Sequence, residues 1–429
     1  MTRDEILKKK AAYIFPCVTT YYKDPLVADH AKGYFLWDLE GKRYLDFFGG
    51  ILTVVVGHCH PTVTGRIQAQ AARLQHTSTV YPTEAMVALA EKLAQITPGR
   101  IQKSFFTNSG TEANEKAIMV ARMATGNYDV VALRHAYSGH SQLAKSITAM
   151  SNWRRGGVVS VGISHALNPY CYRCPLKLTY PSCGVACAED VEATIQTTTS
   201  GAIAAFIAEP IQGAGGFITP PKEYFKMVFT IVKKYGGLFI SDEVQTGFGR
   251  TGTKWFGIEH WEVEPDIITT AKGMANGSPV GGTLATPEVA DAYKGLTIST
   301  FGGNPVTAVA ARATIEVIEE DKLLENAETV GKYFRQRLEE LQAKHPLIGD
   351  VRGLGLMQGM ELVKDPKTKE PAPEETDQFM ERCRANGLLI GKGGLWGNVI
   401  RLSPPLNIAK AQVDDAIERM DKSLTEMRA

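Results

Sequence analysis

Two apolar runs in this chain each end on a side chain that can act on a carbonyl or an amine. One run begins at Asp266 and leads to Lys272, directly before Gly273. Another begins at Gly237 and ends at Asp242. Apolar runs without alternation are typical of strands covered on both faces, and ligands bind beyond the carboxyl ends of parallel strands. We therefore expect a lysine and a carboxylate to meet at one edge of a parallel sheet.

Two further runs bring an acid and an aromatic ring to the same edge. The run from Ala202 leads to Glu209, and the run from Val130 leads to Tyr137. A lysine, two acids and an aromatic side chain at one place suggest a bound aldehyde cofactor with a ring nitrogen, and pyridoxal phosphate has this chemistry. The residues therefore predict a pyridoxal phosphate enzyme without a metal at its site.

Lys272 and Asp242 have definite tasks in that interpretation. Lys272 must be neutral to attack an aldehyde, and burial lowers the pKa of a lysine toward that state. A carboxylate beside a pyridine nitrogen keeps that nitrogen protonated, which makes the ring an electron sink. A solvated lysine and a capping or surface acid are the alternatives, but a lone acid after an apolar run would be costly to bury unpaired. Gln245 is expected to contact the ring oxygen, and Glu209 to shape the cavity.

A phosphate site is expected where a strand-like run ends and a helix begins. Ser109, Gly110 and Thr111 offer backbone N–H groups and two hydroxyls at the positive end of that helix. An ordinary N-cap would explain the same residues. Beside Lys272 and Asp242, the phosphate interpretation is preferred.

Arg401 is the candidate for substrate binding. It lies between apolar neighbours, shortly before Pro404 and Pro405. Its guanidinium can hold a carboxylate through two hydrogen bonds, while a structural salt bridge is the alternative.

Composition narrows the class of protein. The chain has 429 residues, a formal net charge of +1, 44% hydrophobic and 22% charged residues. This balance gives no reason to expect nucleic acid or a membrane surface as a partner. No apolar stretch approaches the roughly 20 residues of a membrane helix, and the N-terminus resembles no targeting signal, so a cytoplasmic location is expected.

The pattern predicts an α/β protein with more than one domain. We expect an N-terminal segment over 1–55, a large cofactor-binding domain over 56–320 and a small C-terminal α/β domain over 321–429. An amphipathic helix is expected over 82–93, and a long helix around 310–340 is expected to join the domains. Beyond residue 320 we expect long charged helices over 321–344 and 412–428, with one glycine-punctuated strand over 350–361 between them.

Four cysteines are closely spaced at Cys171, Cys174, Cys183 and Cys187. Their spacing can hold zinc through thiolates, and a redox pair is a second possibility. Because the spacer between the pairs is not that of a standard zinc module, free thiols are preferred.

Several motifs together resemble the class III aminotransferases, the group that contains ornithine, 4-aminobutyrate and ω-amino acid transaminases. The segment Gly50–His60 looks most like the type 2 alanine–glyoxylate branch. The matching motifs are Gly57-His-Cys-His-Pro61, Asn108-Ser-Gly-Thr-Glu112, Glu209-Pro-Ile-Gln-Gly213, Asp242-Glu-Val-Gln-Thr-Gly-Phe-Gly-Arg250, Lys272-Gly273 and Ser299-Thr-Phe-Gly-Gly-Asn-Pro305.

The resemblance implies a fold-type I enzyme with a mostly parallel seven-stranded sheet. It implies a homodimer with active sites shared between subunits, and pairing of dimers into a tetramer is left open. Lys272 would be the Schiff-base lysine and Tyr137 would stack on the ring. Thr300 would reach the phosphate from the partner subunit, and Arg401 would bind the substrate α-carboxylate.

One departure bears on the substrate. Ornithine and 4-aminobutyrate enzymes have a glutamate where this chain has Ala214, and that glutamate neutralises the arginine when a terminal amine enters. An unmasked Arg401 favours alanine, pyruvate and glyoxylate, and would have to swing aside for an apolar amine.

The resemblance leaves rivals open. A 2-oxoglutarate-using ω-amino acid aminotransferase, an aminomutase and a decarboxylase would share Lys272 and Asp242. A non-catalytic protein of this fold would be expected to lack them. The preferred donor, the enantiopreference and the choice between dimer and tetramer are not readable from the residues.

Overall fold

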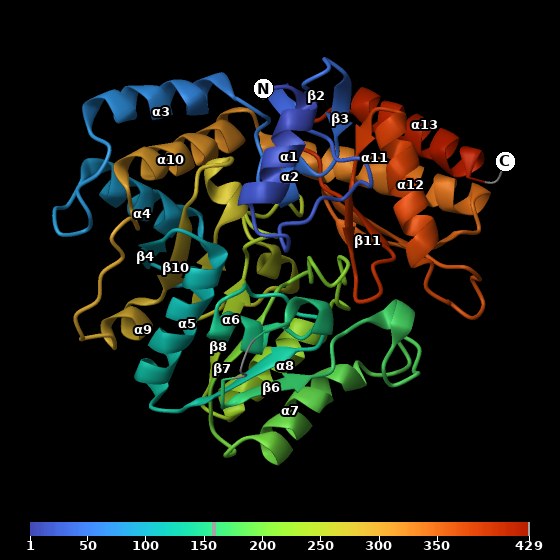
Figure 1. Ribbon diagram of the computed structural model, residues 1–429. Coiled ribbons are helices and arrows are strands. Elements are labelled where there is room, and N and C mark those ends of the chain that lie inside the picture. The colour runs from blue at the N-terminus through green and yellow to red at the C-terminus, as the bar shows by residue number, and fades with distance from the viewer. Residues whose placement is uncertain (157–159, 428–429) are drawn as a thin grey trace.

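A seven-stranded sheet lies at the centre of the computed structural model, which describes residues 1–156 and 160–427 (Figure 1). The strand order is β4-β10-β9-β8-β7-β5-β6. The strands from β9 to β6 run parallel, and β10 runs antiparallel to both of its neighbours. The fold is therefore α/β with a mostly parallel seven-stranded sheet, as expected. The strands are β4 (Lys103–Thr107), β5 (Asp129–Leu133), β6 (Ile163–Ala166), β7 (Ile203–Ala208), β8 (Leu238–Asp242), β9 (Ile267–Thr270) and β10 (Gly281–Ala285).

Both faces of this sheet are covered, which explains the unbroken apolar runs. In β5, Val131 and Leu133 pack in one buried cluster with residues of α7 (Ala186–Thr198) and α8 (Tyr224–Lys234). Val130 and Ala132 pack in another cluster with α5 (Gly110–Thr125). Because successive side chains of a strand point to opposite faces, helices on both sides require apolar residues at every position.

The N-terminal part forms a second sheet and several helices. The sheet has the order β1-β2-β3-β13, so the C-terminal strand β13 (Leu388–Leu389) pairs with β3. The helix expected over 82–93 is α4 (Glu84–Ile96), capped by the Thr83 hydroxyl. The other elements of this part are α1 (Arg3–Tyr13), β1 (Ala28–Lys32), β2 (Phe35–Asp38), β3 (Arg43–Asp46), α2 (Gly49–Leu52) and α3 (Pro61–Arg73). Two further helices, α6 (Gln142–Ile147) and α9 (Pro287–Asp291), contact α5 beside the seven-stranded sheet.

The C-terminal part is built on a third sheet of order β11-β12-β15-β14. It is flanked by α11 (Leu323–Lys344), α12 (Pro373–Ala385) and α13 (Lys410–Glu426). The strands are β11 (Ile348–Leu354), β12 (Met357–Leu362), β14 (Gly391–Gly393) and β15 (Val399–Leu402). The domain boundaries given above stay a prediction.

Two expected elements were wrong in the same way. The single strand over 350–361 is the hairpin β11–β12, because Gly353 and Gly355 take positive φ values of 129° and 52° and turn the chain. The single long helix around 310–340 is two helices, α10 (Pro305–Glu320) and α11, separated where Lys322 has a φ of 52°. A left-handed lysine carries no sequence signal of its own, so a continuous joining helix was wrong. The charged helices expected over 321–344 and 412–428 are confirmed as α11 and α13.

Candidate active site

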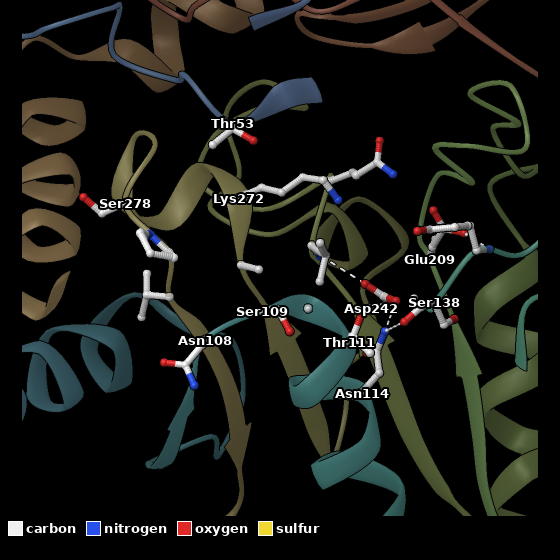
Figure 2. A pocket seen from close by; sticks show the side chains of 18 of the residues that line it. Thr53, Asn108, Ser109, Thr111, Asn114, Ser138, Glu209, Asp242, Lys272 and Ser278 are labelled. Atoms are coloured by element: carbon white, nitrogen blue, oxygen red, sulfur yellow. Dashed lines mark hydrogen bonds between the residues drawn. The ribbon is translucent and has the colours of Figure 1, made fainter. Parts of the chain in front are cut away.

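One cavity of about 280 Å³ gathers most of the predicted site residues (Figure 2). It lies at the carboxyl ends of the parallel strands, where β7, β8 and β9 end at or just before Glu209, Asp242 and Lys272. Thr300 and Arg401 do not line it. The predicted residues that do are Ser109, Gly110, Thr111, Tyr137, Glu209, Asp242, Gln245 and Lys272.

The start of α5 forms one end of the cavity. Ser109 is the N-cap, and its hydroxyl accepts a hydrogen bond from the Glu112 N–H at 3.2 Å. A Cβ on Gly110 would lie 2.9 Å from a methyl group of Val244, so only glycine lets the helix approach so closely. The first-turn N–H groups of a helix have no acceptor within the helix and favour an anion. This end of the cavity therefore suits a phosphate.

Lys272 lies two residues beyond β9, at the start of the short 3-10 helix Lys272–Ala275, with a φ of 39°. Burial lowers the pKa of Lys272, while the carboxylates of Asp242 and Glu209 act in the opposite direction. The positive charge of Arg401 lowers this pKa further. The site thus moves the amine toward the neutral form that a nucleophile needs.

Asp242 is only 3% exposed and is held by hydrogen bonds to both carboxylate oxygens. Its Oδ2 accepts from the Asn114 side chain at 2.8 Å, and its Oδ1 accepts from the Val244 N–H at 3.2 Å. Burial raises the pKa of Asp242, and these two hydrogen bonds oppose that shift. A cation at the cavity would stabilise the carboxylate further.

Asn114 was not predicted from the sequence, although it lies only two residues beyond the Asn108–Glu112 motif, in the first turns of α5. Its amide is fixed in orientation, because Thr269 donates to its oxygen at 2.7 Å and its nitrogen also donates to the Ser138 carbonyl at 3.1 Å. The amide therefore presents N–H to Asp242. Thr53 and Ser138, which also line the cavity, had no sequence signal either.

Glu209 shapes the cavity through its backbone contacts. Its two carboxylate oxygens accept from the N–H groups of Tyr137 at 3.1 Å and Gly213 at 2.7 Å. Burial, and then the charge of Asp242, raise the pKa of Glu209 to about 8. Glu209 thus fixes the segment that carries the Tyr137 ring and the turn that begins at Gly213.

The amide oxygen of Gln245 is buried and lacks a hydrogen-bond partner in the described chain. A Cβ on Gly213 would lie 2.3 Å from that amide, so the glycine makes room for it. An unsatisfied buried amide is costly, and a bound polar group would satisfy it.

Arg401 lies on β15 near the cavity and is 6% exposed. Its Nε donates to the Lys392 carbonyl at 3.1 Å, and its guanidinium packs between the rings of Phe48 and Phe217. Within residues 1–156 and 160–427, no carboxylate forms an ion pair with it. Ala214 is a neighbour: a Cβ on Gly393 would lie 2.9 Å from the Arg401 Cδ and 3.0 Å from the Ala214 carbonyl.

Thr300 lies outside the cavity of its own chain. It is exposed, and the segment around it also exposes Leu296, Ile298 and Phe301. The neighbouring Thr297 accepts a hydrogen bond from Lys116 at 2.9 Å, which places this segment beside α5.

Comparison with known proteins decides the family. The family model for aminotransferase class-III matches residues 19–424. The chain belongs to the class III aminotransferases. It is 45% identical over 425 residues to alanine–glyoxylate aminotransferase 2 homolog 2, mitochondrial, of Arabidopsis thaliana, covering 99% of this chain and 88% of that protein. It is 39% identical over 431 residues to a leucine/methionine racemase of Thermococcus litoralis, covering 100% and 96%.

Solved structures agree with this assignment. An amine transaminase from an uncultivated Pseudomonas species, solved in its PLP-bound form, superposes with a TM-score of 0.90. The two chains are 29% identical, and the match covers 96% of this chain and 98% of that one. This class III aminotransferase is therefore a transaminase that uses pyridoxal phosphate, as the sequence predicts.

The cavity of this aminotransferase fits the cofactor. The helix start suits the phosphate, and Asp242 lies where a cationic ring nitrogen would relieve its burial. The orphan amide of Gln245 suits a ring hydroxyl. The phosphate, the ring nitrogen and the ring hydroxyl would thus each meet a group that the protein leaves incomplete without the cofactor.

The cysteine cluster lies apart from this site. Cys171, Cys174, Cys183 and Cys187 are free thiols around a separate cavity of about 20 Å³. Among the described residues, no group of three or more His, Cys, Asp or Glu side chains is arranged to hold a metal ion.

Over residues 1–156 and 160–427, no helix combines the length and the apolar character needed to cross a bilayer.

Proposed function

We propose that this enzyme transfers an amino group from alanine or another amine donor to a keto acid such as pyruvate or glyoxylate, in two half-reactions. The observation that carries the proposal is the state of Arg401. It is nearly buried, has no carboxylate partner in the described chain, and has Ala214 rather than an acid beside it. A buried guanidinium without a counter-ion favours a ligand that brings a carboxylate.

The residues that would hold pyridoxal phosphate follow from the cavity. Ser109, Gly110 and Thr111 would bind its phosphate, and Lys272 would bind it covalently. Asp242 would pair with its ring nitrogen, Tyr137 would stack on the ring and Gln245 would contact the ring oxygen. When bound, the cofactor supplies an electron sink for the pair of electrons left when the substrate α-proton departs.

The side chains of the protein have three tasks in this reaction. Arg401 binds the α-carboxylate and orients the donor, so that its α-hydrogen faces Lys272. The Lys272 Nζ first accepts that proton as a general base. Later in the same half-reaction it donates the proton again as a general acid. Asn114 donates to the Asp242 Oδ2, which keeps the carboxylate charged and oriented. In the second half-reaction the keto acid occupies the Arg401 site and the proton moves in reverse.

Ala214→Glu tests the substrate assignment. A glutamate beside Arg401 should form an ion pair with it and compete with the substrate carboxylate. We expect the KM for alanine and for pyruvate to rise about 10- to 100-fold, the range for hydrogen bonds to a charged group. Steady-state kinetics with both substrates would measure this. Ala214→Gln adds similar volume without charge and should change KM far less; equal effects of the two variants would contradict the account.

Dimer formation is supported by the exposed segment around Thr300. Its apolar side chains have no cover in one chain, and its threonine lies outside the cavity of that chain. A second copy would cover the segment and would receive Thr300 at its phosphate site. We propose a homodimer with shared active sites.

Thr300→Val should weaken cofactor binding about tenfold by removing one hydrogen bond to a charged group. Thr297→Val is the matched control, because Thr297 already pairs with Lys116 in its own chain. Mixing Thr300→Val with Lys272→Ala subunits creates one site with wild-type Lys272 and a wild-type Thr300 from the other chain. Cofactor affinity at that site, measured by absorbance titration, should return to normal. If cofactor affinity does not recover, Thr300 contacts the phosphate site of its own chain or contacts no phosphate site, and the shared-site proposal is wrong.

Other reactions on this fold remain the alternatives. An aminomutase, a decarboxylase and a 2-oxoglutarate-using ω-amino acid aminotransferase would use the same Lys272 and Asp242. The similarity to a racemase adds racemisation of an amino acid. Stoichiometric keto acid release from L-alanine in a single half-reaction supports transamination over each of the non-transferring reactions. A cytoplasmic location is proposed from the sequence pattern alone.

A further inference from the structure

Two arginines are aligned with each other across three neighbouring strands of the C-terminal sheet. Arg352 on β11 pairs with Gly359 on β12, and Gly359 pairs in turn with Arg401 on β15. Directly paired residues of neighbouring strands point to the same face of a sheet. The two guanidinium groups therefore start from the same face, two strand spacings or about 10 Å apart.

The chain segment 213–217, which we name the 213–217 turn, lies over the glycine between them. A Cβ on Gly359 would lie 3.2 Å from the Phe217 Cβ and 3.6 Å from the Gly216 carbonyl oxygen. The inner end of the turn is held by Glu209 through the Gly213 N–H. Its middle carries Ala214, which is adjacent to Arg401, and Phe217 packs on the Arg401 guanidinium. The 213–217 turn therefore packs against Arg401.

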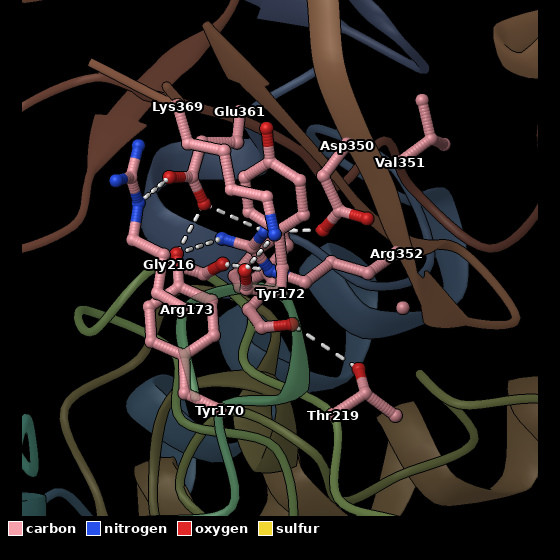
Figure 3. A network of polar contacts seen from close by, with 12 residues as sticks. Tyr170, Tyr172, Arg173, Gly216, Thr219, Asp350, Val351, Arg352, Glu361 and Lys369 are labelled. Carbon is pink, nitrogen blue, oxygen red and sulfur yellow. Dashed lines mark hydrogen bonds and ion pairs between the residues drawn. The ribbon is translucent and has the colours of Figure 1, made fainter. Parts of the chain in front are cut away.

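Arg352 holds the outer end of this turn (Figure 3). Its Nε donates to the Gly216 carbonyl at 2.9 Å. Gly216 has a φ of 109°, which residues other than glycine rarely adopt. The turn therefore has a defined backbone shape at the residue to which Arg352 is hydrogen-bonded.

The rest of the Arg352 guanidinium is occupied by groups that immobilise it. Its Nη1 donates to Asp350 at 2.6 Å and to Glu361 at 2.8 Å, and its Nη2 donates to the Tyr170 hydroxyl at 3.1 Å. Glu361 is fully buried and also pairs with Arg173 and Tyr170 (Figure 3). This network connects the segment before α7 to β11 and β12, so Arg352 has no freedom to bind a substrate.

The two arginines therefore differ in function although they are aligned across the same strands. Arg352 is neutralised by carboxylates and binds backbone, while Arg401 has no carboxylate partner in the described chain. We propose that Arg352 is a positioning residue for substrate binding: it fixes the 213–217 turn so that Arg401 can bind the substrate carboxylate. The proposal rests on the assignment of Arg401 to that carboxylate.

Arg352→Lys tests this role, because lysine keeps the charge beside Glu361 but cannot also reach Gly216 through a second nitrogen. We expect the KM for alanine and for pyruvate to rise about tenfold, with kcat within about threefold of wild type. The dissociation constant of pyridoxal phosphate, measured by absorbance titration, should stay within about twofold. Gly359→Ala should give the same pattern, since its methyl group pushes Phe217 while every arginine is kept.

Arg335→Lys is the matched control. Arg335 on α11 also donates to the backbone of β11, at the Val351 and Gly353 carbonyls. Within residues 1–156 and 160–427, none of its hydrogen bonds goes to the 213–217 turn. It should lower the melting temperature without raising KM. A merely structural Arg352 would behave in the same way, and that result would overturn the proposal.

Arg401→Gln separates the two ways in which the account can fail. If Arg401→Gln leaves KM for alanine and pyruvate unchanged, the substrate assignment itself is wrong. If Arg401→Gln raises KM while Arg352→Lys and Gly359→Ala do not, the assignment stands and only the positioning role of Arg352 is lost.

Discussion

Lys272→Ala is expected to reduce transamination by at least about 10⁴-fold, the upper range for a positioned acid–base group. The variant loses the only amine that the structure places in the described part of the cofactor cavity. With Lys272 as the proposed attachment point, the variant would also lose the covalent bond to the cofactor, and the near-visible absorbance of the lysine-bound form should disappear. Stopped-flow and steady-state assays with alanine and pyruvate, together with absorbance spectra, would measure both effects.

The control for this variant is Lys145→Ala. Lys145 lies on α6, and its amine donates to the Arg155 carbonyl at 3.2 Å on an exposed surface. Its loss should change neither turnover nor spectrum. Wild-type turnover in Lys272→Ala with the cofactor bound would refute the assignment of Lys272.

Asp242→Asn is expected to lower kcat by about 10²- to 10³-fold, the range for losing one preorganised electrostatic group. An amide cannot hold a proton on the ring nitrogen, so the electron sink is weakened even though the shape of the side chain is kept. The neighbouring amide of Asn114 would then face another amide in place of a carboxylate. Cofactor affinity and kcat, measured separately, should both fall.

Glu243→Gln provides a matched buried acid. Glu243 is the next residue, and it is bound by Thr246, Ser241 and two backbone N–H groups of the 257–258 segment. Burial raises the pKa of Glu243 to about 7. The variant should alter thermal stability while kcat stays within a few-fold of wild type. An equal loss of kcat in both variants would mean that Asp242 has no special electrostatic role.

The large sheet and most of the cavity could be predicted because their signals are local. Strands buried on both faces leave unbroken apolar runs, and a polar residue directly after such a run has only the sheet edge to occupy. The sequence pattern alone therefore brings Glu209, Asp242 and Lys272 to one place, and all three line the cavity. Ser109 was predictable for the same reason, as the junction of a strand and a helix.

The missed features depend on contacts between distant segments. Asn114 reads as an ordinary helix residue, and its role arises from Thr269 and Asp242, which lie far along the chain. The break at Lys322 and the hairpin at Gly355 follow from backbone conformation and packing rather than from hydrophobic pattern. The pairing of Arg352 with Arg401 through Gly359 follows from strand register, which one sequence does not specify.

The most direct test of the central claim is chemical trapping of the cofactor on the protein. The holoenzyme would be reduced with borohydride and digested, and the peptide that carries the cofactor mass would be identified by mass spectrometry. The account predicts a single modified residue, Lys272, with no modification in Lys272→Ala. A cofactor found on another lysine, or unmodified peptides from a fully active enzyme, would contradict it.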